Sequence, residues 1–114
     1  MNRWIPLNQI EQLTEIQSNP GLTLIFKHST QCPVSSMAKK SFEWDLDKIP
    51  SEVSLYFLDL IRFRNISNAI AEKWNVLHES PQVILIEAGK AIFHESHAEI
   101  SAIKIGELAN NLAS

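Results

Sequence analysis

The segment LTLIFKHSTQCPVS, residues 22–35, decides the fold, because its hydrophobic pattern changes from one type to another around a single cysteine. Residues 22–26 form a short apolar run of β-prone side chains, of the sort buried in the middle of a sheet. Pro33 suits the first position of a helix, where its missing N–H costs little. Apolar side chains then recur at helical spacing, at Val34, Met37, Ala38, Phe42 and Leu46. Cys32 is therefore expected at a strand-to-helix junction.

The hydrophobic period keeps switching on both sides of this segment. Towards the N-terminus, Asn8 and Glu11 resemble a capping box and apolar residues follow helical spacing, which predicts a helix after Pro6. Towards the C-terminus, a strand is predicted at 53–58 and a helix from Ile66 to Trp74. Two strands at 82–86 and 91–94 then form a predicted hairpin around a reversal at 88–90. A last helix is predicted from about Ser101, and its apolar face carries Ile105, Leu108, Ala109 and Leu112. This order predicts an α/β fold in which two parallel strands are joined by a helical crossover.

Composition excludes several classes of protein. The chain has 114 residues, 45% of them hydrophobic, which fits one compact domain. A formal net charge of -3 and scattered basic residues argue against nucleic-acid binding. A single cysteine excludes an internal disulfide framework and a structural zinc site built on two or more cysteines. The N-terminus lacks an apolar signal region and no apolar run approaches membrane-spanning length, so the cytoplasm is the expected location.

Cys32 is better placed for chemistry than for packing. Unpaired backbone N–H groups and the positive end of the helix dipole both favour a thiolate at the start of a helix. Three residues on, where a dithiol site would carry its second sulfur, the chain has Ser35, which implies a one-sulfur mechanism. Ser35 can offer a hydroxyl hydrogen bond to the thiolate but cannot form a disulfide. The alternative is that Cys32 is a small buried hydrophobe, as free cysteines often are.

Four motifs follow one another along the chain. They are Lys27-His28-Ser29-Thr30-x-Cys32-Pro33-Val34-Ser35, Arg64-x-x-Ser67-Asn68-x-Ile70-Ala71, Val76-x-His78-Glu79-Ser80-Pro81-Gln82 and Ser96-His97-x-x-Ile100. Together they resemble the monothiol bacilliredoxin family of the thioredoxin-like superfamily. The resemblance implies a single thioredoxin-like domain over residues 1–114, with a central four-stranded mixed sheet flanked by helices and an extra N-terminal helix. It also implies that the Ser80–Pro81 peptide bond is cis and lies against Cys32.

The resemblance further implies an activity, the removal of bacillithiol from mixed disulfides on cytoplasmic proteins. Cys32 would be the catalytic residue and would form a mixed disulfide with the small thiol. A second small thiol, bacillithiol or glutathione, would then resolve that intermediate as co-substrate. No tightly bound cofactor is implied, and the partners would be a low-molecular-weight thiol and S-thiolated client proteins, with no nucleic acid and no membrane. The substrate-binding residues implied are Lys27, Thr30, Gln31, Pro33, Ser35, Ser80 and Pro81.

Two other functions fit the same cysteine. One is a non-enzymatic adaptor of the same fold. The other is a monothiol iron–sulfur carrier, in which Cys32 and a small thiol would each supply a cluster ligand. A protein that is colourless after anaerobic purification would argue against the carrier.

Several polar and aromatic residues also have ordinary structural explanations. Lysines are mostly solvated, so Lys27 is either a surface charge or a counter-charge for the ligand or the thiolate. His28 beside it is expected to face the opposite side of the strand end. Arg64 and Ser67 start a helix and suit capping or surface contacts, whereas His78 and Glu79 could support the ligand-binding loop that they precede. Metal binding is not expected at His94 and His97. The three tryptophans, Trp4, Trp44 and Trp74, are expected to be apolar anchors for the helices.

Overall fold

A mixed five-stranded sheet forms the centre of the molecule in a computed structural model that describes residues 3–113. The strand order is β1-β3-β2-β4-β5. The pairs β1–β3 and β2–β3 are parallel, and the pairs β2–β4 and β4–β5 are antiparallel. The strands are β1 (Trp4–Pro6), β2 (Leu22–His28), β3 (Ser54–Asp59), β4 (Gln82–Glu87) and β5 (Lys90–Ser96). The predicted strands and the crossover between β2 and β3 are therefore present.

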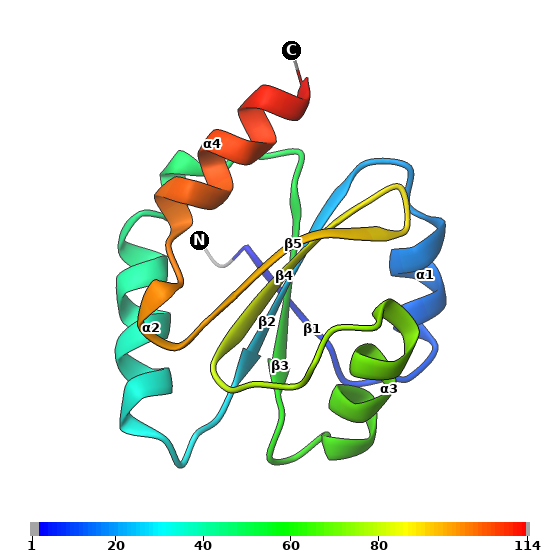
Figure 1. The fold of residues 1–114 in the computed structure, drawn as a ribbon, viewed down its shortest axis with the longest axis vertical. Helices are drawn as coiled ribbons and strands as arrows, with labels where there is room; N and C mark the ends of the chain where they lie inside the picture. The colour runs from blue at the N-terminus through cyan, green and yellow to red at the C-terminus, as the bar shows by residue number, and fades with distance from the viewer. Residues whose placement is uncertain (1–2, 114) are drawn as a thin grey trace.

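Helices cover both faces of the sheet. They are α1 (Gln12–Ser18), α2 (Pro33–Trp44), α3 (Arg64–Trp74) and α4 (Ala102–Ala113), with short 3-10 turns η1 (Leu46–Lys48) and η2 (His97–Glu99). Figure 1 shows α2 and α4 on one side of the sheet and α1 and α3 on the other. Within residues 3–113, no helix is both long enough and apolar enough to cross a membrane.

Two hydrophobic clusters, one on each face, follow from the alternation of side chains along β2. Leu24 and Phe26 point into the cluster that contains Phe42 of α2, with the Phe26 and Phe42 ring centroids 5.4 Å apart. Ile25 points into the opposite cluster, which includes residues of α1 and α3. Both neighbours of β2 are strands, so its apolar run is buried on both faces, as its sequence predicts.

The sheet has five strands, whereas four were expected from the sequence. The additional strand is β1. This strand has three residues and ends on a proline, so it carries no hydrophobic period that could reveal it. Its position depends on distant contacts. The Arg3 guanidinium donates four hydrogen bonds of 2.9–3.2 Å to backbone carbonyl oxygens in the segment between α2 and β3. The acceptors are the carbonyl groups of Leu46, Ile49, Pro50 and Val53. Tertiary contacts therefore hold β1 beside β3.

The N-terminal helix is also shorter than its apolar pattern suggests. It begins at Gln12, and its N-cap residue Glu11 makes no side-chain capping bond, so the predicted capping box is absent. The Gln12 side chain replaces it, because Oε1 accepts hydrogen bonds of 2.8 Å from the backbone N–H groups of Asn8 and Gln9. Leu7 is buried but lies before the helix, in the segment that leaves β1.

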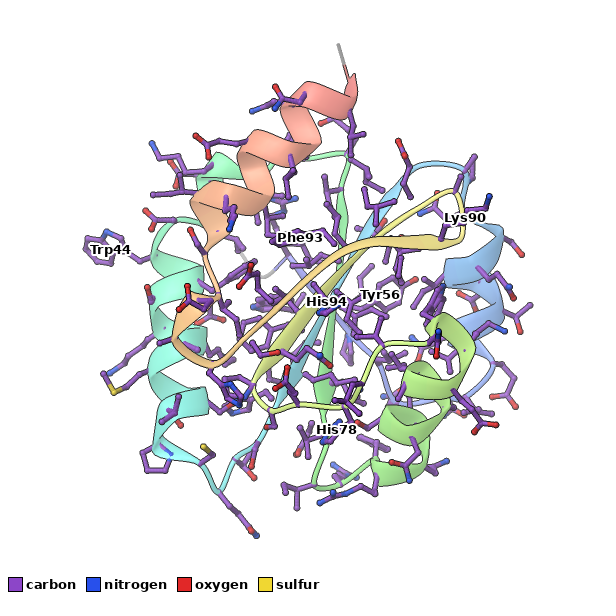
Figure 2. The ribbon with its side chains drawn as sticks, viewed as in Figure 1. Trp44, Tyr56, His78, Lys90, Phe93 and His94 are labelled. Carbon is purple, nitrogen blue, oxygen red and sulfur yellow. The ribbon has the colours of Figure 1, made fainter. Side chains whose placement is uncertain are left out.

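Four apolar helix residues expected in the core are instead exposed. Trp44, expected to anchor a helix, is 86% exposed and extends from the end of α2 into solvent (Figure 2). Met37 is 72% exposed, and Val34 and Leu112 are also exposed. The sheet-facing side of α2 is instead formed by Ser35, Ala38 and Phe42, which follow the i, i+3, i+7 spacing of one helix face. The exposed residues lie on the adjacent face.

The hairpin between β4 and β5 follows its predicted turn chemistry. Ala88 and Gly89 both have positive φ angles, 49° and 81°, as a two-residue hairpin turn of type I′ requires. The Trp74 indole donates a 3.0 Å hydrogen bond to the Gly89 carbonyl, which joins α3 to the turn. Trp74 is buried and anchors its helix as expected.

Candidate functional site

Cys32 is the N-cap residue of α2 and is half-buried. Its backbone is extended, with φ −117° and ψ 116°, and Pro33 occupies the first helical position. The first amide N–H groups of a helix have no carbonyl partner within the helix, and they point towards the N-cap side chain. A thiolate at this position therefore faces hydrogen-bond donors and the positive end of a twelve-residue helix. This is the junction that the sequence predicts.

The loop before Cys32 is fixed by Ser29. The Ser29 carbonyl accepts a 3.3 Å bond from the Cys32 N–H, and its hydroxyl accepts a 3.3 Å bond from the Gln31 N–H. Ser29 is buried, whereas Thr30, Gln31 and Pro33 are exposed. The side chains of these three predicted substrate-binding residues are thus accessible beside the cysteine.

Ser35 is fully buried and does not face the sulfur as a free hydroxyl. Its Oγ accepts a 3.0 Å hydrogen bond from the Ser29 N–H and lies 2.7 Å from Nδ1 of His28. Among the residues that the structure describes, neither bond partner of this hydroxyl is Cys32. The expected hydrogen bond from Ser35 to the thiolate is therefore replaced by bonds to the loop and to His28.

His28 occupies the last position of β2 and faces the α2 side. Its ring centroid lies 5.4 Å from that of Phe57 on β3. Burial lowers the pKa of His28, as does the nearby Lys39 ammonium, so the ring is neutral near pH 7. Strand alternation predicts the direction of His28, opposite to Lys27, but gives no indication that it meets Ser35.

Lys27 is 0% exposed, which is unusual for a lysine and excludes a surface charge. Its Nζ donates a 3.2 Å hydrogen bond to the Ser67 carbonyl of α3 and lies 3.3 Å from His78 Nδ1. Burial lowers the pKa of Lys27 to about 8. The pKa of His78 is lowered by burial first, and then by Lys27 and Arg64. Because two cations at this distance repel each other, the cluster favours one shared positive charge.

The loop at residues 77–81 joins α3 to β4 at the same end of the sheet. His78 lies in the lower half of Figure 2, and its contact with Lys27 places it beside the C-terminal end of β2. Gln82 pairs with Lys27 across the antiparallel strands, so Pro81 lies one residue beyond that pair, towards the loop that carries Cys32. The Ser80–Pro81 peptide bond is cis.

Two hydrogen bonds tie this loop to the end of β5 and the turn η2, and the Ser80 hydroxyl takes part in neither. The Glu79 carboxylate accepts a 2.7 Å bond from the Ser96 hydroxyl, and the Pro81 carbonyl accepts a 2.9 Å bond from the His97 N–H. The Ser80 hydroxyl oxygen is buried and has no hydrogen-bond partner within the described part of the chain. The Ser80 hydroxyl oxygen is therefore both shielded from solvent and unpaired within residues 3–113.

An apolar hollow opens on the α2 side of Cys32. It has a volume of about 340 Å³ and lies between α2 and the turn η2, lined by Val34, Met37, Ala38, Ser41, His97, Ala98 and Ile100. Its first lining residue, Val34, is two positions from the cysteine. Across residues 3–113, no group of three or more His, Cys, Asp or Glu side chains is arranged to hold a metal ion.

Comparisons with known proteins agree with this arrangement. The chain matches the family described as Monothiol bacilliredoxin BrxC over residues 5–105. It is similar to the solved structure of a candidate oxidoreductase with a thioredoxin fold, at 29% identity and a TM-score of 0.79, over 94% of this chain and 93% of that chain. It is also similar to the thioredoxin of Trypanosoma brucei brucei, at 21% identity and a TM-score of 0.66, over 96% and 87%. A third similar structure is a thioredoxin of Malassezia sympodialis, at 16% identity and a TM-score of 0.70, over 96% and 90%. The two thioredoxins show the fold, and the family match adds a thiol redox role.

Proposed function

The chain belongs to the monothiol bacilliredoxin family, and from that membership we propose that it removes bacillithiol from mixed disulfides on proteins. The observation that carries the proposal is the position of Cys32. It is the only cysteine of the chain and the N-cap of a helix, and a serine stands three residues later. A thiolate at a helix start is suited to attack a disulfide, and a lone thiol can only exchange one small thiol at a time.

The proposed cycle has two exchange steps. In the first, the Cys32 thiolate attacks the bacillithiol sulfur of the mixed disulfide, and a new disulfide forms between Cys32 and bacillithiol. The bond to the client breaks, and the client sulfur leaves with the electron pair as a thiolate, which takes up a proton from water. The client is thereby reduced and Cys32 is oxidised.

In the second step, the thiolate of another bacillithiol molecule attacks the bacillithiol sulfur bound to Cys32. Bacillithiol disulfide forms, and the Cys32 sulfur leaves as a thiolate ready for another cycle. The second thiol is required because Ser35 supplies no sulfur. We place this cycle in the cytoplasm of a cell that uses bacillithiol.

The other residues of the site have supporting roles in this proposal. Exposed Thr30 and Gln31 would donate hydrogen bonds to polar groups of the small thiol. The backbone N–H and C=O of Ser80, which precedes Pro81, would pair with the same ligand. Lys27 would act from beneath the site through its positive charge, because its Nζ is enclosed by Ser67 and His78.

The test is to incubate the protein separately with a bacillithiolated client and with the same client glutathionylated, and to follow both by intact mass. Transfer of the small thiol to the protein from the bacillithiolated client alone supports the proposal. Transfer from the glutathionylated client alone would mean that the substrate carries glutathione and not bacillithiol. An unchanged rate of client reduction by Cys32→Ala would refute the role of Cys32. Ser36→Ala is the matched control, because its side chain is exposed beside the site.

A further inference from the structure

Ser35 joins three parts of the site through one buried hydroxyl. It lies in the first turn of α2, accepts the Ser29 N–H at 3.0 Å, and lies 2.7 Å from His28 Nδ1 at the end of β2. Ser29 in turn accepts the Cys32 N–H through its carbonyl at 3.3 Å. A continuous path of hydrogen bonds therefore runs from His28 through Ser35 and Ser29 to the backbone of the cysteine.

The hydrogen-bonding capacity of the Ser35 hydroxyl determines which group is the donor in its bond to His28. A hydroxyl has one hydrogen and two lone pairs, and the Ser29 N–H occupies one lone pair of Ser35. Within residues 3–113, the hydroxyl has no partner besides Ser29 and His28, so its hydrogen is satisfied only when His28 Nδ1 accepts it. That requires a neutral ring with its proton on Nε2.

We propose that Ser35 and His28 act as a positioning pair that fixes the Cys32 loop for attack. The inference rests on Cys32 being the nucleophile of the proposed function. It assigns Ser35 a purpose beyond the absence of a second sulfur. The hydroxyl commits its only proton to His28 and its lone pair to Ser29, so it acts on Cys32 through the backbone and not by a bond to the sulfur.

Protonation of His28 should disrupt this pair. A protonated ring donates from Nδ1, so Ser35 would accept two bonds and its own hydrogen would lose its partner. The charged groups that face the ring are Lys39 and Glu43 from α2 and Asp59 from the end of β3, while the Phe57 ring packs against it from β3. Burial and Lys39 oppose the protonated form, whereas the two carboxylates and a hydrogen bond to the Ser35 backbone favour it. The pair should therefore weaken only on acidification.

Variants of both residues test the proposal with two readouts, small-thiol transfer and alkylation of Cys32 by iodoacetamide. Ser35→Ala and His28→Phe should each slow both reactions about tenfold, since modest misplacement of a reacting group carries a cost of this order or more. His28→Asn should recover most of the loss, because its amide oxygen can accept the Ser35 hydrogen near the position of Nδ1. The double variant Ser35→Ala with His28→Phe should be no slower than the slower single variant.

The pH dependence separates this role from a merely structural one. The ratio of the alkylation rates of wild type and His28→Asn should stay constant near neutral pH and fall on acidification, because only the wild-type ring gains a proton. A flat ratio over a pH range in which NMR shows His28 gaining its proton, or single-variant effects that multiply in the double variant, would overturn the proposal. If Ser35→Ala does not fold by circular dichroism, the comparison of His28→Phe with His28→Asn decides. Alkylation needs no bacillithiol, so failure of the proposed substrate leaves this test intact.

Discussion

Replacing Lys27 by methionine should remove a rise in stability that the wild-type protein gains at alkaline pH. Burial lowers the pKa of Lys27 from 10.5 to about 8 in the folded protein. Between these two values the unfolded chain holds a proton that the folded chain has released, so the free energy of unfolding increases with pH. Below pH 8 both states hold the proton and the effect is absent.

The size of the rise follows from the two pKa values. Each unit of difference corresponds to about 1.4 kcal/mol, so the full effect of Lys27 is roughly 3 kcal/mol by pH 11. About 2 kcal/mol of it falls between pH 7 and pH 9.5. With a denaturant slope of about 2 kcal/mol/M in urea, the wild-type midpoint should gain about 1 M over this interval relative to Lys27→Met.

The assay is urea unfolding of wild type, Lys27→Met and Lys40→Met at both pH values. Lys40 is exposed on α2, so its replacement should leave the pH dependence of the wild type unchanged. Other groups that titrate in this range are common to all three proteins and cancel in the comparison. Parallel pH dependences for wild type and Lys27→Met would show that burial does not destabilise the Lys27 cation.

Three further predictions concern other parts of the molecule. Ser35→Cys should convert the protein to a dithiol enzyme, in which the new thiol displaces the small thiol from Cys32 and no free small thiol is needed. Intact mass should then show an internal disulfide, two hydrogens lighter than the reduced protein. Gly106→Ala should lower the free energy of unfolding in urea by about 1–3 kcal/mol, because the new Cβ would clash with the Lys48 carbonyl oxygen. The same change within a helix is ordinarily stabilising. Arg3→Ala should cost about 1–2 kcal/mol in the same assay, since four carbonyl groups lose a charged donor but regain water, and Arg3→Lys should not restore it. An unchanged urea midpoint for Gly106→Ala or Arg3→Ala would contradict the contact described at that residue. A persistent adduct in Ser35→Cys would contradict the expectation that a sulfur at position 35 can reach Cys32.

Much of the fold is predictable because its signals are local. The apolar run of β2 lies between two other strands and is buried on both faces, so its composition alone indicates its place. The turn at Ala88 and Gly89 likewise follows from short-range backbone preferences. The strand β1 escapes sequence analysis because three residues carry no period, and its position depends on Arg3 reaching across the molecule.

The helix faces show the limit of apolar spacing as a guide. The predicted stripe on α2 was too wide, because it joined the buried face of Phe42 with the exposed face of Met37. Both faces carry apolar residues at helical spacing, and only the packing of α2 on the sheet distinguishes them. Of the exposed apolar side chains on α2, Val34 lies two residues from Cys32, and it lines the hollow beside η2 together with Met37.

The site was predictable as a position but not as a network. The place of Cys32 follows from a strand, a loop and a proline in sequence, all of which are local features. The burial of Lys27 and the bond between His28 and Ser35 depend on which elements meet above and below β2. Strand alternation indicates that Lys27 and His28 face opposite sides, but it does not identify their partners.

In the proposed cycle, Cys32 takes up the small thiol and cannot release it without a second one. The most direct measurement is a single-turnover time course by intact mass, with a bacillithiolated client and no free thiol. We expect the client to lose bacillithiol as the protein gains it, the adduct to map to Cys32 and persist, and added bacillithiol to clear it. A client that stays modified, or an adduct that disappears before any thiol is added, would contradict the one-sulfur mechanism.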